Sequence, residues 1–195
     1  MASVYGTICQ RRTIRRFQKK PISEEMLVKL VNAARLAPSG ANIQPCEYII
    51  VNNEQLVDKL FTCLKWAGYI APAGNPPEGE RPVSYIVVLI DVNRKKKGGE
   101  VDAAAGIENI LLAAWEMGIG SCWLGSIDRK QIKKLLRIPH HLKVDSLVAL
   151  GYPNELPVVE DAQDSIKYWK DKEDVLHVPK RKLEEILHRN RYGTN

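Results

Sequence analysis

The sequence predicts a protein of the α/β type, in which short strands alternate with helices along one chain. The β-rich apolar runs lie at residues 48–51, 85–90, 118–125 and 147–150, and segments with helical spacing of apolar residues lie at 23–37, 54–64, 103–117 and 128–138. Taken alone, this alternation favours a parallel doubly wound sheet. The run at 85–90 is apolar without interruption, which is typical of a strand covered on both faces.

Local signals mark where the helices begin and end. The first predicted helix follows Ser23, a good N-cap residue, and it stops at Pro38. Another helix is capped at Asp128, where Gln131 completes a capping-box pattern. The helix at 103–117 is apolar around most of its circumference, so we expect it to be buried in a core or in a subunit interface.

Residues 64–82, called the lid segment below, form the least regular part of the chain. They are rich in proline and glycine, which predicts a loop. The segment carries Trp66 and Tyr69, and an aromatic ring that folds over a binding site would stack on a flat substrate. The alternative is that both rings pack into the core.

Composition is typical of an ordinary globular protein. The 195 residues, 45% hydrophobic and 27% charged, predict a single domain over residues 1–195. No apolar run is long enough to cross a membrane, and the scattered cysteines favour reduced thiols in the cytoplasm. The basic residues behind the net charge of +6 are mostly dispersed, apart from a run at 94–97 that is typical of a solvated loop, and no nucleic-acid-binding motif is present. The histidines have no metal-ligand spacing. We therefore expect no nucleic acid, membrane or metal as a partner.

The strongest chemical signal is a cluster of cations near the start of the chain. Residues 11–17, called the arginine segment, read Arg11-Arg12-Thr13-Ile14-Arg15-Arg16-Phe17 and bring four guanidinium groups together with a hydroxyl. Guanidinium groups bind phosphate through bidentate, charge-assisted hydrogen bonds. Because the chain has no glycine-rich phosphate-binding fingerprint, side chains would have to hold the phosphate.

A second segment, residues 37–45, is a Pro-Ser-Gly turn that carries Asn and Gln amides and is called the amide loop. Amides offer both donors and acceptors to the edge of a planar heterocycle. The alternative is a plain turn that ends a helix, since these residue types are common in turns. Together the two segments predict a phosphorylated cofactor with a heteroaromatic head.

The two segments, in this order and about a helix apart, resemble the nitroreductase family of FMN-dependent oxidoreductases. Its members open with an R-R-S/T-x-R-x-F segment and a P-S-x-x-N-x-Q-P loop, and the likeness extends to an Ala-rich helix, a Gly-rich turn and Gly151-Tyr152-Pro153. The resemblance implies an α+β fold: a nitroreductase-like three-layer α/β/α sandwich with a mixed central sheet, in an intertwined homodimer. The long central helices would pair across the interface, and residues 151–195, called the tail, would form an arm that reaches the partner subunit.

The resemblance also implies cofactor-binding positions. Arg11, Arg12 and Thr13 match residues that bind the phosphate and ribityl chain of FMN, and Arg15 matches a residue at the pyrimidine edge of the flavin. The amide-loop positions that match residues reaching the flavin of the opposite subunit are Pro38, Ser39, Gly40, Asn42 and Gln44. The backbone N–H groups that match those near flavin N5 belong to Leu124 and Gly125. The basic pair that would complete the phosphate clamp is Lys180 and Arg181.

These positions also have plainer alternatives. The arginine segment could be a solvated basic stretch, and Arg16 is expected to be an exposed charge. Leu124 and Gly125 could simply connect a strand to a helix, and the basic pair could flank a helix. The chain departs from the family at Cys46, where many members have an aromatic residue, and this difference bears on local packing.

The implied activity is that of an FMN-dependent NAD(P)H oxidoreductase. Hydride would pass from NADH or NADPH through flavin N5 to a flat conjugated acceptor such as a nitroaromatic or a quinone, in a ping-pong reaction without a catalytic protein side chain. Reductive dehalogenation, ene-type reduction and flavin-consuming chemistry on the same fold stay open, and so does an FMN carrier or sensor without turnover. The expected partners are a second copy of the chain and a small-molecule electron acceptor.

Overall fold

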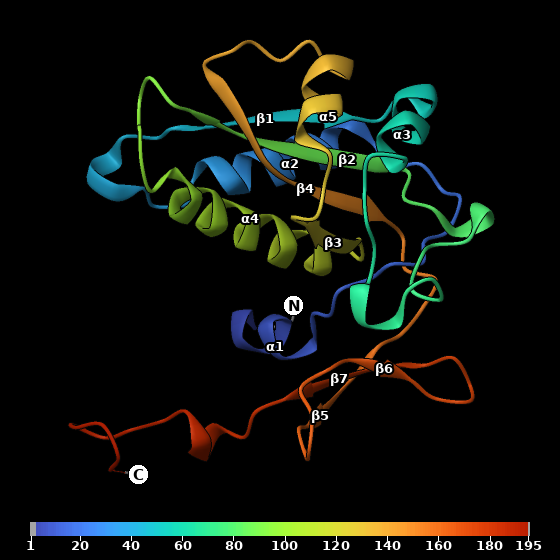
Figure 1. The fold of residues 1–195 in the computed structure, drawn as a ribbon, viewed down its shortest axis with the longest axis vertical. Coiled ribbons are helices and arrows are strands. Elements are labelled where there is room, and N and C mark those ends of the chain that lie inside the picture. The colour runs from blue at the N-terminus through green and yellow to red at the C-terminus, as the bar shows by residue number, and fades with distance from the viewer. Residues whose placement is uncertain (1–2, 195) are drawn as a thin grey trace.

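The computed structural model describes residues 3–194, and its centre is a four-stranded sheet in the order β1-β2-β4-β3 (Figure 1). The strands are β1 (Cys46–Val51), β2 (Ser84–Asp91), β3 (Gly120–Leu124) and β4 (Leu142–Gly151). All the pairings between them are antiparallel; Val87 of β2, for example, lies between Ile49 and Leu147. The chain is therefore an α+β protein, and the prediction of a parallel doubly wound sheet is wrong.

The apolar pattern of a strand does not encode its direction. β2 is buried at every position, as its uninterrupted apolar run predicts, but helices on both faces bury an antiparallel strand equally well. The expected mixed sheet would contain parallel pairs. Among the described residues, the parallel pairing in the central sheet is limited to an isolated bridge between Thr13 and Ser121 of β3.

Helices cover both faces of the sheet. They are α2 (Glu24–Arg35), α3 (Glu54–Phe61), α4 (Gly99–Glu116) and α5 (Arg129–Leu135), and the short helix α1 (Val4–Gln10) packs against α4. α2 and α4 pack with Ile86 and Val88 on one face, whereas α3 and α5 pack with Val87 and Leu89 on the other. Alternate side chains of β2 thus serve two separate cores. Between residues 3 and 194, no helix combines the length and apolar character needed to span a membrane.

The two predicted helix caps are confirmed. Ser23 Oγ accepts a hydrogen bond from the N–H of Met26 at 3.3 Å, and Asp128 Oδ1 accepts one from the N–H of Gln131 at 3.0 Å. Helix α1 was not predicted because it has only seven residues, too few to display a clear apolar period.

The lid segment is a loop, as its composition predicts. Residues 64–82 contain two short 3₁₀ turns, Gly68–Ile70 and Glu78–Glu80, and no longer element. Its first residues are fixed to the connection between β3 and α5, where the N–H of Lys65 donates to the carbonyl of Ser126 at 3.0 Å.

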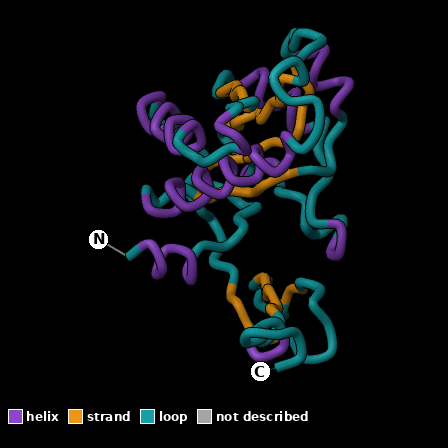
Figure 2. The backbone as a smooth tube through the Cα atoms, turned by 90° about the vertical axis from the view of Figure 1, so that its left-hand side faces the viewer, coloured by secondary structure: helices purple, strands orange, loops and turns teal. Residues whose placement is uncertain are grey.

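The tail forms a small second sheet below the main body. Its strands are β5 (Val158–Asp161), β6 (Trp169–Lys170) and β7 (Leu176–Lys180), in the order β5-β7-β6. Figure 2 shows this sheet apart from the central one, and Figure 1 places it beyond α1. After β7 the chain runs away from the body with Leu183, Ile186 and Leu187 exposed.

A histidine between two carboxylates joins the strands of the tail sheet. His177 Nδ1 lies 2.9 Å from Glu160 Oε2, and His177 Nε2 lies 3.2 Å from Asp171 Oδ2. The ring of Trp169 stacks on the imidazole with a centroid distance of 4.1 Å. Hydrogen bonds with Glu160 and then Asp171 raise the pKa of His177, and the hydrogen bond with His177 lowers the pKa of Glu160. Both imidazole nitrogens donate when the ring is charged, so the charged form holds the sheet together.

We expect the tail sheet to loosen as the pH rises. A raised pKa in the folded state means that the stabilisation by His177 is complete below the unfolded pKa of about 6.5 and is lost as the pH rises through the folded value. The pH dependence due to Glu160 has the opposite sign, because the stabilisation that comes from its lowered pKa is lost only as the pH falls into the acid range. Hydrogen-exchange protection of residues 158–180, corrected for intrinsic rates, should therefore fall as the pH rises above about 6.5 and through the raised pKa of His177. His177→Gln should remove this pH-dependent fall in protection. If the fall is unchanged in the variant, His177 is not the group responsible for it.

Candidate active site

The arginine segment is fixed along the edge of the central sheet. The N–H of Ile14 donates to the carbonyl of Ser121 at 2.9 Å, next to the bridge between Thr13 and Ser121. Ile14 and Phe17 are fully buried, so the polar residues between and before them are held by both backbone pairing and packing. The sequence predicted the cluster, and β3 explains why it is rigid.

The same pairing brings the segment close to the predicted backbone positions at the end of β3. Leu124 lies three residues beyond Ser121, which is roughly 10 Å along a strand. Leu124 is buried, but a Cβ placed on Gly125 would meet no other atom within 4 Å. The backbone at Gly125 is therefore open to a ligand.

Arg15 is the most unusual side chain of the segment. Its Nε is buried and finds no hydrogen-bond partner among residues 3–194, and the same holds for Ser121 Oγ. The guanidinium carbon of Arg15 lies 5.0 Å from the centre of the Tyr168 ring. Buried polar groups without protein partners suit a ligand that offers hydrogen-bonding atoms.

The neighbouring arginines have different surroundings. Arg11 makes a long ion pair with Glu108 of α4, with Nε and Oε1 3.8 Å apart. Arg12 donates to the backbone carbonyls of Cys9 and Arg11 at the end of α1. Arg11 is the freer of the two to turn towards an anion, since a pair at this distance in partial contact with water is weak.

Arg16 departs from the expectation of an exposed charge. It lies 2.6 Å from Asp174 Oδ2 and 3.5 Å from Glu80 Oε2, so it links the tail to the end of the lid segment. The carboxylate of Glu155 accepts from the N–H groups of both Arg15 and Arg16, and the latter distance is 3.2 Å. The first half of the tail is thus fixed to its own arginine segment.

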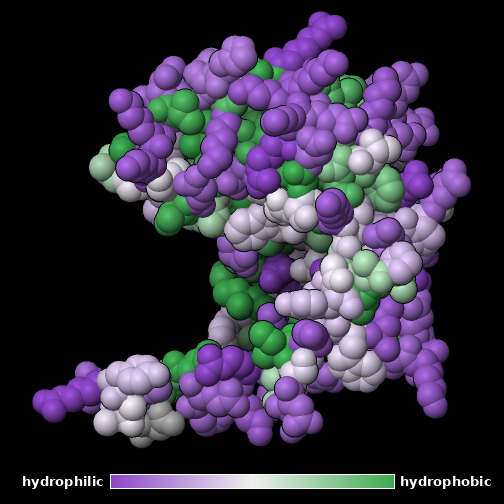
Figure 3. Space-filling view, viewed as in Figure 1, coloured by the Kyte–Doolittle hydropathy of each residue, from purple (hydrophilic) through white to green (hydrophobic). Residues whose placement is uncertain are grey.

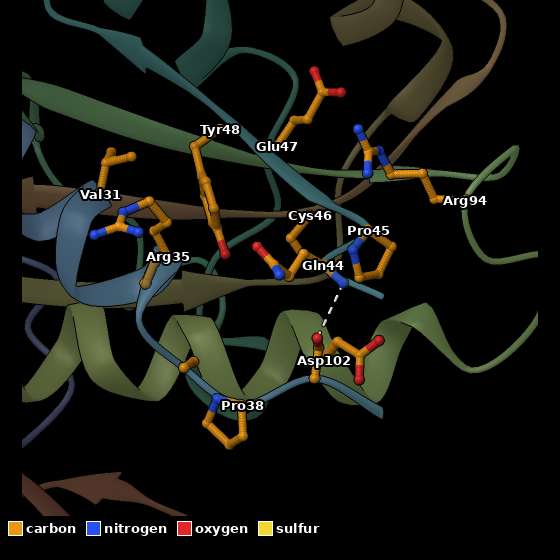
Figure 4. A pocket seen from close by; sticks show the side chains of 13 residues that line it. Val31, Arg35, Pro38, Gln44, Pro45, Cys46, Glu47, Tyr48, Arg94 and Asp102 are labelled. Atoms are coloured by element: carbon orange, nitrogen blue, oxygen red, sulfur yellow. Dashed lines mark hydrogen bonds between the residues drawn. The ribbon is translucent and has the colours of Figure 1, made fainter. Parts of the chain in front are cut away.

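The amide loop lies beside the first turns of α4. Gln44 donates its N–H to Ser39 Oγ at 3.0 Å (Figure 4). Its side-chain amide donates to Asn42 Oδ1, also at 3.0 Å. Behind the loop is a cavity of about 350 Å³, lined by Val31, Ala34, Arg35, Ala37, Pro38, Ser39, Gln44, Pro45, Cys46, Glu47, Tyr48, Arg94 and Asp102. Within the part of the chain that the structure describes, no hydrogen bond or ion pair joins the loop to the arginine segment.

The basic pair of the tail is likewise not brought to the arginine segment. Lys180 is exposed at the end of β7, and Arg181 pairs with Glu185 at 3.2 Å. A single chain therefore assembles Arg11–Arg15 with Leu124 and Gly125, and leaves the amide loop and the basic pair elsewhere.

The two aromatic residues of the lid segment differ. Trp66 is only 4% exposed and packs against Phe61, so its ring has no free face for a substrate and the expectation that it stacks on one is not retained. Tyr69 is 60% exposed, and its ring lies 5.0 Å from that of Tyr168. The N–H of Tyr69 also donates to the hydroxyl of Tyr168 at 3.4 Å.

Three residues near the site had no sequence signal strong enough to find them. Tyr168 and Glu155 lie in the tail, outside any motif, although an aromatic pair in a charged stretch is a weak cue. Asp102 is an acidic residue near the start of an apolar helix, a pattern with no distinctive functional signal, but it accepts a hydrogen bond from the N–H of Gly40 at 3.0 Å. Each acts on a partner that is distant in the sequence.

The cysteines near the site are protonated at neutral pH. Burial raises the pKa of Cys122 to about 11, and burial followed by the charge of Asp102 raises the pKa of Cys46 to about 11. A protonated thiol is a weak nucleophile. Over residues 3–194, no three His, Cys, Asp or Glu side chains gather as a candidate metal site.

Comparison with known proteins places the chain in a family. The family model described as "Nitroreductase family" matches residues 8–76 and 85–152, which include the arginine segment, the amide loop and β3. The chain belongs to the nitroreductase family. The family match leaves out the end of the lid segment and nearly all of the tail, so Tyr168 and Glu155 lie outside the matched residues.

Relatives of this chain are named as redox enzymes. A protein of Archaeoglobus fulgidus, assigned as an NADH dehydrogenase/NAD(P)H nitroreductase, is 36% identical over 164 residues, 80% of this chain and 89% of that protein. An iodotyrosine deiodinase of Thermotoga neapolitana is 26% identical and covers 80% of this chain and 91% of its own. A Desulfovibrio desulfuricans protein, assigned as a nitroreductase and solved in complex with FMN, has a TM-score of 0.71 at 25% identity, covering 98% of this chain and 99% of its own.

Proposed function

We propose that the chain is an FMN-dependent NAD(P)H oxidoreductase that acts on flat conjugated acceptors. The observations that carry the proposal are the buried Arg15 Nε and Ser121 Oγ, which lack hydrogen-bond partners among residues 3–194, and the open backbone at Gly125, at the end of the strand that holds Ser121. Flavin rings offer hydrogen-bonding atoms along one edge and at N5. Bound FMN would supply the redox chemistry, taking hydride from NAD(P)H and passing electrons to the acceptor.

The residues of one chain fit three parts of FMN. Arg11, Arg12 and Thr13 would hold the phosphate. Lys180 or Arg181, which a single chain leaves away from these residues, would complete the clamp from the tail of a second copy of the chain. Arg15 would place a positive charge at the pyrimidine edge, where it favours negative charge on the reduced ring. The backbone at Leu124 and Gly125 would approach N5.

The amide loop would come from a second copy of the chain. Within the described residues of one chain, no hydrogen bond or ion pair joins the loop to the arginine segment, which supports a site shared between two protomers. α4 carries an outward stripe at alternating spacings of four and three residues, Val101, Ala105, Glu108, Leu112 and Trp115, all exposed or half-buried. Nearby α1 exposes Val4, Tyr5 and Ile8, and Figure 3 shows apolar side chains around the hollow between body and tail. A partner copy would cover these residues and meet the tail.

The acceptor would bind next to Tyr69 and Tyr168. These rings lie side by side and Tyr168 contacts Arg15, so they border the region where the flavin edge is proposed. Stacking between aromatic rings favours flat conjugated molecules. Reductive dehalogenation is the second candidate, because the Thermotoga neapolitana relative is named an iodotyrosine deiodinase and halogenated phenols are also flat.

The experiment is anaerobic reduction of the purified, FMN-loaded protein. The yellow absorbance should bleach with NADH or NADPH and return when a nitroaromatic, a quinone or a halogenated phenol is added. The acceptor that restores the colour fastest identifies the reaction. Yellow protein that neither nucleotide bleaches would indicate a carrier or sensor, and protein that takes up no FMN would overturn the proposal.

Tyr69→Ala should change acceptor choice without removing the cofactor. Stacking contributes about 0.5–1.5 kcal/mol beyond area burial, so KM for flat acceptors should rise by a few-fold to about tenfold while kcat and FMN content stay close to wild type. The check is kcat/KM across the acceptor panel. Tyr192→Ala, which removes a tyrosine that is 92% exposed, serves as the control. If the ratios of kcat/KM among the acceptors are the same in Tyr69→Ala as in Tyr192→Ala, Tyr69 lies away from the acceptor.

A further inference from the structure

Asp102 lies in the first turn of α4 with its side chain only 6% exposed. Its Oδ1 accepts from the N–H of Gly40 at 3.0 Å, and its Oδ2 lies 2.6 Å from Lys95 Nζ. The ion pair compensates the burial of the carboxylate, which otherwise would be costly. The hydrogen bond from Lys95 lowers the pKa of Asp102, so the carboxylate is charged at neutral pH.

The amide loop needs support from outside itself. Ala41, Asn42 and Gln44 have φ values of 50°, 54° and 53°, in the left-handed region that side-chain-bearing residues rarely adopt. The bonds from Gln44 to Ser39 and Asn42 lie within the loop. Among the described residues, the bond from Gly40 to Asp102 is the hydrogen bond that joins residues 39–44 to another element.

The fit around Gly40 is close. A Cβ at this position would lie 3.1 Å from Lys95 Nζ and 3.9 Å from Asp102 Oδ1. The loop backbone therefore rests directly on the ion pair. Figure 4 shows Asp102 on α4 beside Gln44, at the wall of the cavity.

We propose that Asp102 is a positioning residue that holds the amide loop in the conformation that reads the flavin ring of the partner protomer, with Lys95 keeping its carboxylate charged and in place. The inference rests on the proposed function, since it assigns a task to the loop of that site. Asp102 touches no cofactor; it acts through Gly40. The carboxylate near the start of α4 also benefits from the helix dipole, so three local features favour it there.

The test uses the full-length protein and FMN, with Asp102→Ala and Asp102→Asn as variants. Glu100→Ala is the matched control, because Glu100 lies in the same turn and pairs with Lys143 at 2.5 Å but forms no hydrogen bond or ion pair with residues 37–45. Two readouts are needed: hydrogen exchange of residues 39–44 without cofactor, and the Kd values of FMN and riboflavin.

Asp102→Ala should deprotect residues 39–44 and weaken FMN and riboflavin by the same factor, about tenfold, since the loop reads the ring and not the phosphate. Asp102→Asn keeps an acceptor for Gly40 and should lose less of both protection and affinity. Glu100→Ala should match wild type. If Asp102→Ala does not fold, Lys95→Ala tests the same device, with a smaller loss of protection expected at the same residues.

Wild-type affinity and loop protection in Asp102→Ala would overturn this inference while leaving the proposed function intact. Deprotection across the whole protein would also overturn it, since it would assign Asp102 to general stability. Wild-type protein that takes up no FMN would instead refute the proposed function, and with it the task assigned to Asp102. The two failures are therefore distinguishable.

Discussion

Arg11→Ala is expected to weaken FMN binding about ten- to a hundredfold and to leave riboflavin binding nearly unchanged. Removing one charged hydrogen-bonding partner typically costs about 1.5–3 kcal/mol, which corresponds to that range of Kd. The lost partner would be the phosphate, which riboflavin lacks. Arg11 has only a long ion pair with Glu108 to give up on binding, so its guanidinium is available. Titration of the apoprotein with both flavins measures the difference.

Arg16→Ala is the matched control for this prediction. Arg16 lies in the same segment, but it is committed to Asp174 and Glu80, so its loss should loosen the tail without changing the ratio of the two affinities. Equal weakening of FMN and riboflavin in Arg11→Ala would reject the phosphate role. It would leave the arginine segment as a structural element along β3.

Leu112→Asp should give monomers that have lost FMN. Leu112 is half-buried on the outward stripe of α4, and a carboxylate in an apolar interface costs on the order of several kcal/mol. FMN should be lost together with assembly, because the amide loop would come from the partner. Light scattering during gel filtration gives the mass, and absorbance near the flavin band gives the cofactor content.

The position of the substitution matters here. Leu111, one residue earlier, is 4% exposed in the core of its own chain, so a carboxylate there would unfold the protomer and test nothing about assembly. Val28→Asp, at a residue 51% exposed on α2, is a suitable control and should stay dimeric with FMN bound. A folded Leu112→Asp monomer with a full complement of FMN would show that one chain builds the whole site.

Local features of the fold could be predicted and non-local ones could not. The caps at Ser23 and Asp128 depend on residues three positions away, so the sequence displays them directly. The antiparallel direction of β2 depends on how connections cross the sheet, which apolar periodicity does not record. The tail strands are short and largely exposed, and His177 pairs with carboxylates that no motif connects to it.

In the candidate site, too, the contiguous motifs could be predicted from the sequence and the long-range contacts could not. The arginine segment and the amide loop are contiguous motifs, and their residue types alone suggest a phosphorylated heteroaromatic ligand. Trp66 and Tyr69 look equivalent in the sequence, yet one packs on Phe61 and the other faces solvent, because burial is decided by elements from elsewhere in the chain. Asp102 could not be assigned because Gly40, which it holds, is sixty-two positions away.

The central claim is that each flavin site combines the arginine segment of one protomer with the amide loop of the other. Mixed dimers test it most directly. One protomer carries Arg11→Ala and the other carries Ser39→Ala with Asn42→Ala, and the two carry different affinity tags so that heterodimers can be isolated. FMN content is then measured at a concentration at which neither mutant homodimer binds and the wild type is saturated.

In a shared site, the heterodimer has one site with both defects and one site with none. The account therefore predicts that the heterodimer regains FMN at one of its two sites, with NAD(P)H-dependent bleaching of that flavin. If the site belonged to a single chain, both sites of the heterodimer would remain defective. A heterodimer as empty of FMN as its parent homodimers would contradict the account.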